Sequence, residues 1–60
     1  MPLSGKEMLR MYEREGWKVV RQRGSHIRVK KGALSESIPM HEELKKGTEQ
    51  YLLKVLEGGR

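Results

Sequence analysis

The chain has 60 residues, with 13 lysines and arginines, 8 acidic residues and no cysteine, which gives a net charge of +5. This length allows one domain with a thin core, expected here to span residues 1–60, and the lack of cysteine excludes disulfides and thiolate metal sites. No apolar run approaches the roughly 20 residues that span a membrane, and the first residues show no signal-peptide pattern, so we expect a soluble, cytoplasmic protein.

The positive charge is concentrated in the middle of the chain. Residues 17–31 contain six cations and no acidic residue, whereas the rest contains seven cations against eight acidic residues. A local excess of this kind favours binding to nucleic acid or to an acidic protein partner. The alternative is a face that is only solvated, and basic composition alone does not choose between the two.

A first helix is predicted over about residues 5–15. Ser4 and Glu7 have the spacing of a capping box, and Leu3 and Met8 have that of a hydrophobic staple. The glycine that follows can adopt the left-handed conformation that ends many helices.

Three strands are predicted next. Residues 17–23 are rich in strand formers, and residues 26–31 alternate between apolar and polar side chains. A two-residue turn, Gly24-Ser25, joins these two segments. A second glycine turn leads to a third strand that ends at Pro39.

A second helix is predicted over about residues 49–57, with Thr48 as its N-cap, after a loop that begins at Met40. The order α-β-β-β-α indicates an α+β fold, in which a three-stranded antiparallel sheet carries two helices on one face. The expected core consists of Leu9, Tyr12, Val20, Ile27, Val29, Ile38, Leu52 and Leu56.

The two-residue turn predicts the pairing of the first two strands. Arg23 then pairs with His26 and Arg21 with Arg28, while valines pair on the opposite face. Directly paired residues share a face, so one side of the hairpin is expected to be basic. Its members are Arg21, Arg23, His26, Arg28 and Lys30. The two arginines that face each other repel, which suggests that a bound anion offsets the cost.

This register also places Trp17 and Val19 on the basic side. A bulge that redirects them, a Trp17 side chain that covers a sheet edge, and an exposed Trp17 platform for a ligand are three explanations, of which burial is favoured. A three-residue loop would instead pair Gln22 with His26 and move His26 to the apolar face.

His26 is the strongest candidate for chemistry. Surrounding cations disfavour a charged imidazole, and a neutral imidazole can act as a general base. RNA carries its own nucleophile, the 2′-OH, so cleavage needs a base, cations for the transition state and a proton donor, without a metal or cofactor. His41 is a second candidate acid or base, although a loop hydrogen bond is the plainer interpretation. Two histidines in unrelated contexts do not form a metal site.

The segment LKKGT, residues 44–48, leads into the second helix. Free N–H groups at a helix start, next to Lys45 and Lys46, form a generic phosphate site. A solvated loop is the alternative. With Ser25 of the turn, the residues expected to bind RNA or phosphate are Arg21, Arg23, Ser25, Arg28, Lys30, Lys45 and Lys46.

Two segments carry a wider pattern: GWKVVRQRGSHIRVKKG and, after it, IPMHEELKKGTEQYLLKVL. Together they resemble the HicA (YcfA-like) mRNA interferase toxins over nearly the whole chain, most specifically in GWxxVRQxGSH. Glu49 departs from the apolar residue usual in the family, so the start of the second helix is expected to be solvated or shifted here. Arg28 also departs, and is expected to alter RNA contacts.

The resemblance implies a fold similar to the double-stranded-RNA-binding domain. It implies a small toxin that cleaves mRNA and is neutralised by a HicB-type antitoxin. The family's catalytic histidine corresponds to His26, with Gly24 and Ser25 as its neighbours in the motif, and its second-half histidine corresponds to His41.

Two other functions remain open from the sequence. A non-catalytic RNA-binding module of the same fold would bind RNA in a salt-dependent way without cleaving it. A protein-binding domain would use the basic face for an acidic partner and would not affect RNA.

Overall fold

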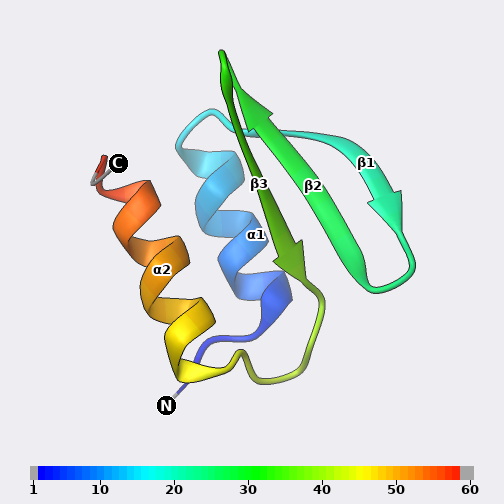
Figure 1. Ribbon diagram of the computed structural model, residues 1–60, viewed down its shortest axis with the longest axis vertical. Coiled ribbons are helices and arrows are strands. Elements are labelled where there is room, and N and C mark those ends of the chain that lie inside the picture. The colour runs from blue at the N-terminus through cyan, green and yellow to red at the C-terminus, as the bar shows by residue number, and fades with distance from the viewer. Residues whose placement is uncertain (1, 59–60) are drawn as a thin grey trace.

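The computed structural model describes residues 2–58. Its elements are α1 (Gly5–Arg14), β1 (Lys18–Arg23), β2 (His26–Lys31), β3 (Leu34–Pro39) and α2 (Lys46–Leu56). The strands form one antiparallel sheet in the order β1-β2-β3, and both helices lie on the same side of it (Figure 1). The predicted α-β-β-β-α order is confirmed. No helix in the described part of the chain is long and apolar enough to cross a membrane.

The start of α1 follows the predicted capping box. The Ser4 hydroxyl accepts a hydrogen bond from the Glu7 N–H at 3.1 Å, and a Glu7 carboxylate oxygen accepts one from the Ser4 N–H at 2.9 Å. Each bond satisfies a backbone donor that the helix itself leaves without a partner. The helix ends at Arg14, one residue before the predicted end.

Gly5 brings the first turn of α1 against the end of β3. Its N–H donates to the His41 carbonyl oxygen at 2.9 Å. A Cβ atom at this position would overlap the Pro39 carbonyl oxygen and lie 2.7 Å from the Met40 Cα. The two backbones therefore approach so closely that only glycine fits, and this contact joins α1 to the loop that carries His41 (Figure 1).

The β1–β2 hairpin has the predicted turn and, next to it, the predicted pairs. Gly24 has a φ of 57°, which suits glycine, and Arg23 pairs with His26 and Arg21 with Arg28. Further along, Val19 pairs with Val29, because the ladder is interrupted between Val19 and Arg21 by a β-bulge. The extra residue shifts the rest of β1 by one position.

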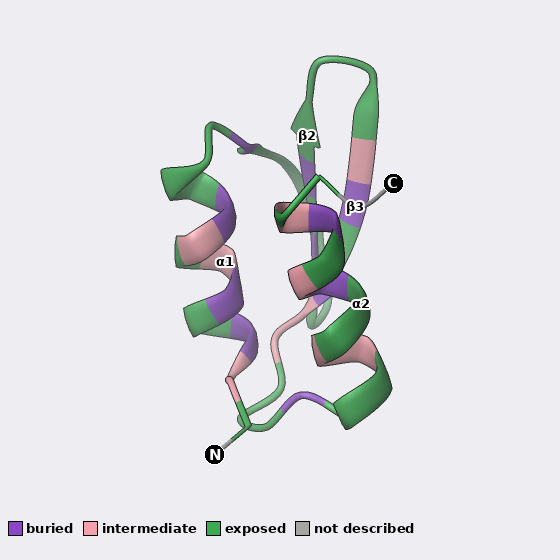
Figure 2. Cartoon of the chain, turned by 90° about the vertical axis from the view of Figure 1, so that its left-hand side faces the viewer, coloured by how far each residue is buried: buried purple, intermediate pink, exposed green. Residues whose placement is uncertain are grey.

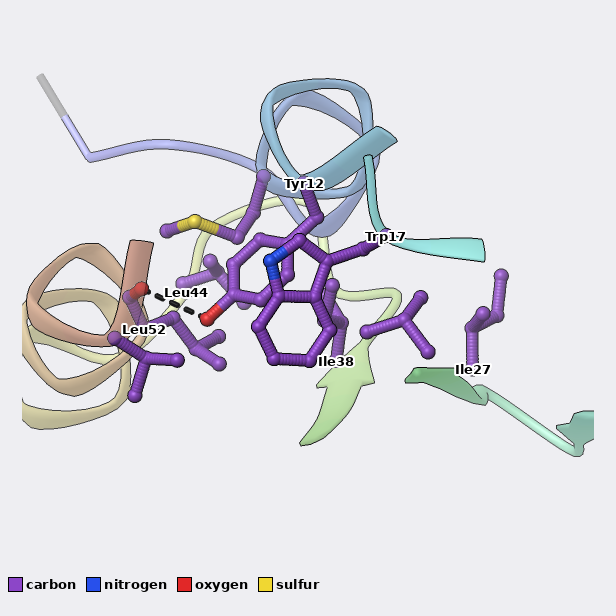
Figure 3. Close-up of a cluster of buried hydrophobic side chains, with 9 residues drawn as sticks. Tyr12, Trp17, Ile27, Ile38, Leu44 and Leu52 are labelled. Atoms are coloured by element: carbon purple, nitrogen blue, oxygen red, sulfur yellow. Dashed lines mark hydrogen bonds between the residues drawn. The ribbon is translucent and has the colours of Figure 1, made fainter. Parts of the chain in front are cut away.

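This bulge corrects one prediction and decides another. Val20 was expected in the core, but as the extra residue of the bulge it is 56% exposed. Trp17 moves off the basic face and is buried, which confirms the favoured interpretation. Its ring meets that of Tyr12 edge to face, with 4.9 Å between the ring centroids (Figure 3).

The core lies between the helices and the sheet, where the buried faces of α1 and the strands meet (Figure 2). Of the residues predicted there, Leu9 and Leu56 are only half-buried and pack at its margin. Met8, Leu44 and Val55 were not predicted. The buried apolar residues are Met8, Tyr12, Trp17, Ile27, Val29, Ile38, Leu44, Leu52 and Val55.

Tyr12 links the two helices through a buried hydrogen bond. Its hydroxyl donates to the Leu52 carbonyl oxygen at 2.8 Å (Figure 3). We expect Tyr12→Phe to keep the ring packing, lose this bond and lower the free energy of unfolding by about 1 kcal/mol. Urea denaturation of the two proteins measures the difference. An equal midpoint for both would show that the bond contributes nothing to stability.

The start of α2 differs from the prediction. The helix begins at Lys46, and its N-cap, Lys45, makes no side-chain capping bond, whereas Thr48 was expected as the cap. Contacts with the N-terminal segment hold this earlier start: the Leu3 N–H donates to a Glu49 carboxylate oxygen at 2.6 Å, and the Leu44 N–H to the Leu3 carbonyl at 2.9 Å. The expected shift at Glu49 is therefore found, with Glu49 half-buried.

Candidate nucleic-acid interface and active site

The face of the sheet that the helices leave uncovered is basic. Residues of β1 beyond the bulge, alternate residues of β2 and the serines of β3 share this face by their pairing. We call it the basic face. Its charged and titratable members, all exposed, are Arg21, Arg23, His26, Arg28 and Lys30.

The basic face carries no carboxylate from the sheet. Glu36 is the one acidic residue in the three strands. It lies on the helix side, where it is buried and accepts hydrogen bonds from the Tyr51 hydroxyl at 3.1 and 3.0 Å. The arginines of the basic face therefore attract anions without competition from a neighbouring acid.

A shallow hollow on the basic face brings His26 together with arginines. It has a volume of about 160 Å³ and is lined by Arg21, Arg23, His26, Arg28 and Ser37. Arginine guanidinium groups bind phosphate oxygens through paired hydrogen bonds. The arrangement can therefore hold a phosphate group against the His26 imidazole.

Like charges face one another across this hollow. Arg21 pairs directly with Arg28, as predicted, and the Arg28 guanidinium donates to the Ser35 hydroxyl at 3.0 Å. Like charges opposite each other in a sheet cost stability. A bound anion would offset that cost, so the pair is better suited to holding a ligand than to stabilising the fold.

The two histidines lie close together although they are 15 positions apart in the sequence. The ring centroids of His26 and His41 are 6.4 Å apart, with an angle of 71° between the planes. No group of three His, Cys, Asp or Glu side chains within residues 2–58 is arranged to hold a metal ion. The donor set at this place is a pair of imidazoles.

His41 lines a second hollow on the other side of the hairpin. It has a volume of about 480 Å³ and lies between the start of α1 and the inner face of β1 and β2. Its lining residues are Ser4, Lys6, Leu9, Gln22, Ile27, Met40, His41 and Glu42. His26 and His41 thus stand where the two hollows approach each other, at the end of the sheet.

The lysines before α2 lie apart from the basic face. Lys46 lines a different hollow with Pro2, Leu44, Glu49 and Gln50, and the Glu49 carboxylate there already accepts the Leu3 N–H. Lys45 and Lys46 are both exposed. Of the predicted RNA contacts, the structure brings together Arg21, Arg23 and Arg28 around His26, and it leaves Lys45 and Lys46 at a separate place.

Ser25 and Lys30 are also placed outside the hollow around His26. Ser25 lies in the turn, where its carbonyl oxygen accepts the Met40 N–H at 2.6 Å, and Lys30 lies further along β2. Ser35 and Ser37 were not predicted. The alternation of β3 could have indicated them, since both lie on the face opposite Ile38.

Comparison with known proteins identifies the family. The family model described as HicA toxin of bacterial toxin-antitoxin matches residues 5–57. The chain belongs to the HicA toxin family. Both histidines and the whole basic face of this HicA-family chain fall inside the matched stretch. Searches of curated proteins and of solved structures each found no match.

Proposed function

We propose that this HicA-family toxin is an endoribonuclease that cleaves mRNA without a metal ion, with His26 as the general base. The observation that supports it best is the hollow in which His26 is grouped with three arginines on an uncovered, acid-free face. The arginines bind the phosphate that is to be cleaved. The imidazole of His26 then removes the proton from the adjacent 2′-OH.

The chemistry balances without a cofactor. The 2′ oxygen forms a bond to phosphorus as its proton passes to His26, and the bond from phosphorus to the 5′ oxygen of the next nucleotide breaks. That oxygen leaves with a proton, which gives a 2′,3′-cyclic phosphate and a 5′-OH end. Positive charge from Arg21, Arg23 and Arg28 stabilises the extra negative charge on phosphorus in the transition state.

Lys45, Lys46, Ser25 and Lys30 extend the RNA-binding surface in this proposal. Lys30 continues the line of cations along β2, and Ser25 flanks His26 in the turn. Lys45 and Lys46 are well placed for phosphates further along the same strand of RNA, because they lie at the end of the loop that begins beside His26. Single-stranded RNA suits such a surface, since its backbone can follow a bent path.

The proposed neutralising partner is a HicB-type antitoxin that covers the basic face. Occupying the hollow around His26 would block access of RNA and would also relieve the repulsion between Arg21 and Arg28. An acidic segment of the antitoxin would fit this face by charge. RNA and antitoxin are then expected to compete for the toxin.

The test compares an RNA oligonucleotide with a fully 2′-O-methylated copy of the same sequence, both with EDTA. We expect the first to be cut, with 2′,3′-cyclic phosphate ends, and the second to be bound but left intact. Salt-dependent binding of both without cleavage would instead favour a non-catalytic RNA-binding module. Cleavage that stops in EDTA would contradict the histidine mechanism.

Arg28 offers a prediction in which binding and stability change in opposite directions. In a His26→Ala background, Arg28→Gln should lower the slope of log K against log salt by about 0.7, because one phosphate contact is lost. It should also raise the free energy of unfolding by a few tenths of a kcal/mol, since the repulsion with Arg21 disappears. Arg10→Gln, an exposed arginine on α1, is the matched control and should leave the slope unchanged.

A further inference from the structure

We propose that His41 is the general acid that protonates the leaving 5′ oxygen. This inference rests on the proposed cleavage of RNA, and it assigns the second proton transfer of that reaction. The base takes a proton from the 2′-OH on one side of phosphorus, and the acid gives one to the 5′ oxygen on the other. His26 and His41 are the two imidazoles that the fold places side by side.

The distance between the rings suits a phosphate held between them. Attack by the 2′ oxygen and departure of the 5′ oxygen occur on opposite sides of phosphorus, so base and acid must be apart but must each come within about 2.6–3.2 Å of their oxygen. Ring centroids 6.4 Å apart satisfy both needs. Two imidazoles in direct contact would leave no room for the phosphate.

Both histidines are held in place by the backbone. His26 begins β2 and pairs with Pro39, and the Met40 N–H donates to the Ser25 carbonyl at 2.6 Å, which fastens the loop to the hairpin turn. The Gly5 N–H donates to the His41 carbonyl at 2.9 Å. Groups fixed in this way before the substrate binds need not be ordered during the reaction.

The side chain of His41 is free to act, which the plainer structural interpretation does not explain. Within the described residues the hydrogen bond of His41 is made by its backbone carbonyl, and its side chain is exposed. A residue needed only for that bond could be of any type. The imidazole itself therefore calls for another role.

The charged groups near the two rings differ in a way that matches the two roles. Three arginines, Arg21, Arg23 and Arg28, line the hollow with His26, whereas Lys6 and Glu42 line the hollow with His41. Cations alone suit a neutral base, and a carboxylate nearby suits a group that carries a proton. The larger hollow, of about 480 Å³, gives the nucleotide with the leaving oxygen a place beside His41.

A substrate with a sulfur leaving atom tests this assignment. The bond that the wild type cuts is first mapped on an RNA oligonucleotide, and its 5′ bridging oxygen is then replaced by sulfur. A thiol such as that of cysteine loses its proton near pH of about 8.5, against about 15.7 for water, so a thiolate leaves without a proton donor. His41→Ala should cut the oxygen substrate roughly 10²–10⁴ times more slowly than wild type but the sulfur substrate at nearly the wild-type rate.

Matched variants give the result its meaning. His26→Ala should lose cleavage of both substrates, because neither is attacked without the base. Glu43→Ala, an exposed change in the same loop, should cut both as wild type does. His41→Asn keeps a polar side chain of similar size, and thermal melts of all variants check that they fold.

Two outcomes would overturn the assignment while leaving the proposed nuclease intact. One is a His41→Ala or His41→Asn variant that cuts the oxygen substrate at the wild-type rate. The other is a loss of activity that sulfur does not restore, which would make His41 a binding residue. Failure of the wild type itself to cut RNA would reject the nuclease, and this inference with it.

Discussion

Replacing His26 with alanine is expected to lower the rate of RNA cleavage by roughly 10²–10⁴-fold and to leave the fold unchanged. The loss follows from removal of the base that takes the 2′-OH proton. The fold should persist because His26 is exposed on the face away from the core, where substitutions usually change stability by less than about 0.5 kcal/mol.

Two measurements check this prediction. Initial cleavage rates of purified protein give the factor directly, and growth of cells that express each variant shows whether toxicity depends on the same residue. Lys54→Ala, an exposed change in the last turn of α2, controls for the loss of a surface cationic side chain. A His26→Ala protein that remains fully toxic and cuts RNA at the wild-type rate would show that the base is another group.

Gly5→Ala should be among the most damaging single-methyl changes in the protein. The new Cβ would overlap the Pro39 carbonyl oxygen, and backbone atoms, unlike the end of a flexible side chain, cannot turn away. Overpacking of this kind costs about 1–3 kcal/mol or more. Typical stabilities per residue give a domain of this size only roughly 3–9 kcal/mol in total, so much of the folded population could be lost.

Gly47→Ala is the matched control, because it places the same methyl group near the start of the other helix. Nothing lies within 4 Å of a Cβ at Gly47, and alanine favours helix, so its stability should be unchanged or up to about 1 kcal/mol higher. Urea denaturation of both variants measures the contrast. Equal midpoints for Gly5→Ala and wild type would mean that the contact between α1 and the end of β3 is loose.

Gly5→Ala should also reduce cleavage beyond its effect on folding. The same glycine donates to the carbonyl of His41, so a displaced first turn of α1 moves the loop that holds the proposed acid. Cleavage rates normalised to the folded fraction would separate the two effects.

The sequence predicted the parts of the site that depend on local chemistry. The glycine at position 24 determined the turn, and the turn determined the pairs from Arg23 with His26 to Arg21 with Arg28. The capping box at Ser4 likewise located the start of α1, because both of its hydrogen bonds join residues three positions apart.

The errors occurred where distant parts of the chain meet. Val20 was assigned to the core because a regular ladder was assumed, and a bulge leaves no sign in the alternation of a short strand rich in valine. Thr48 had the better capping side chain, but α2 begins earlier, where Leu3 makes hydrogen bonds with Glu49 and Leu44. The approach of His41 to His26 depends on an irregular loop whose path no periodicity describes.

The bulge in β1 has a consequence for solubility. Because the sheet order is β1-β2-β3, β1 is an edge strand, and an open edge with its unpaired backbone groups can add strands from other molecules and lead to aggregation. A bulge disrupts the regular backbone that such pairing needs, and the cations Lys18, Arg21 and Arg23 repel a second copy of the same edge. The irregularity that sends Trp17 into the core and leaves the arginines outside thus also protects the free protein from stacking on itself.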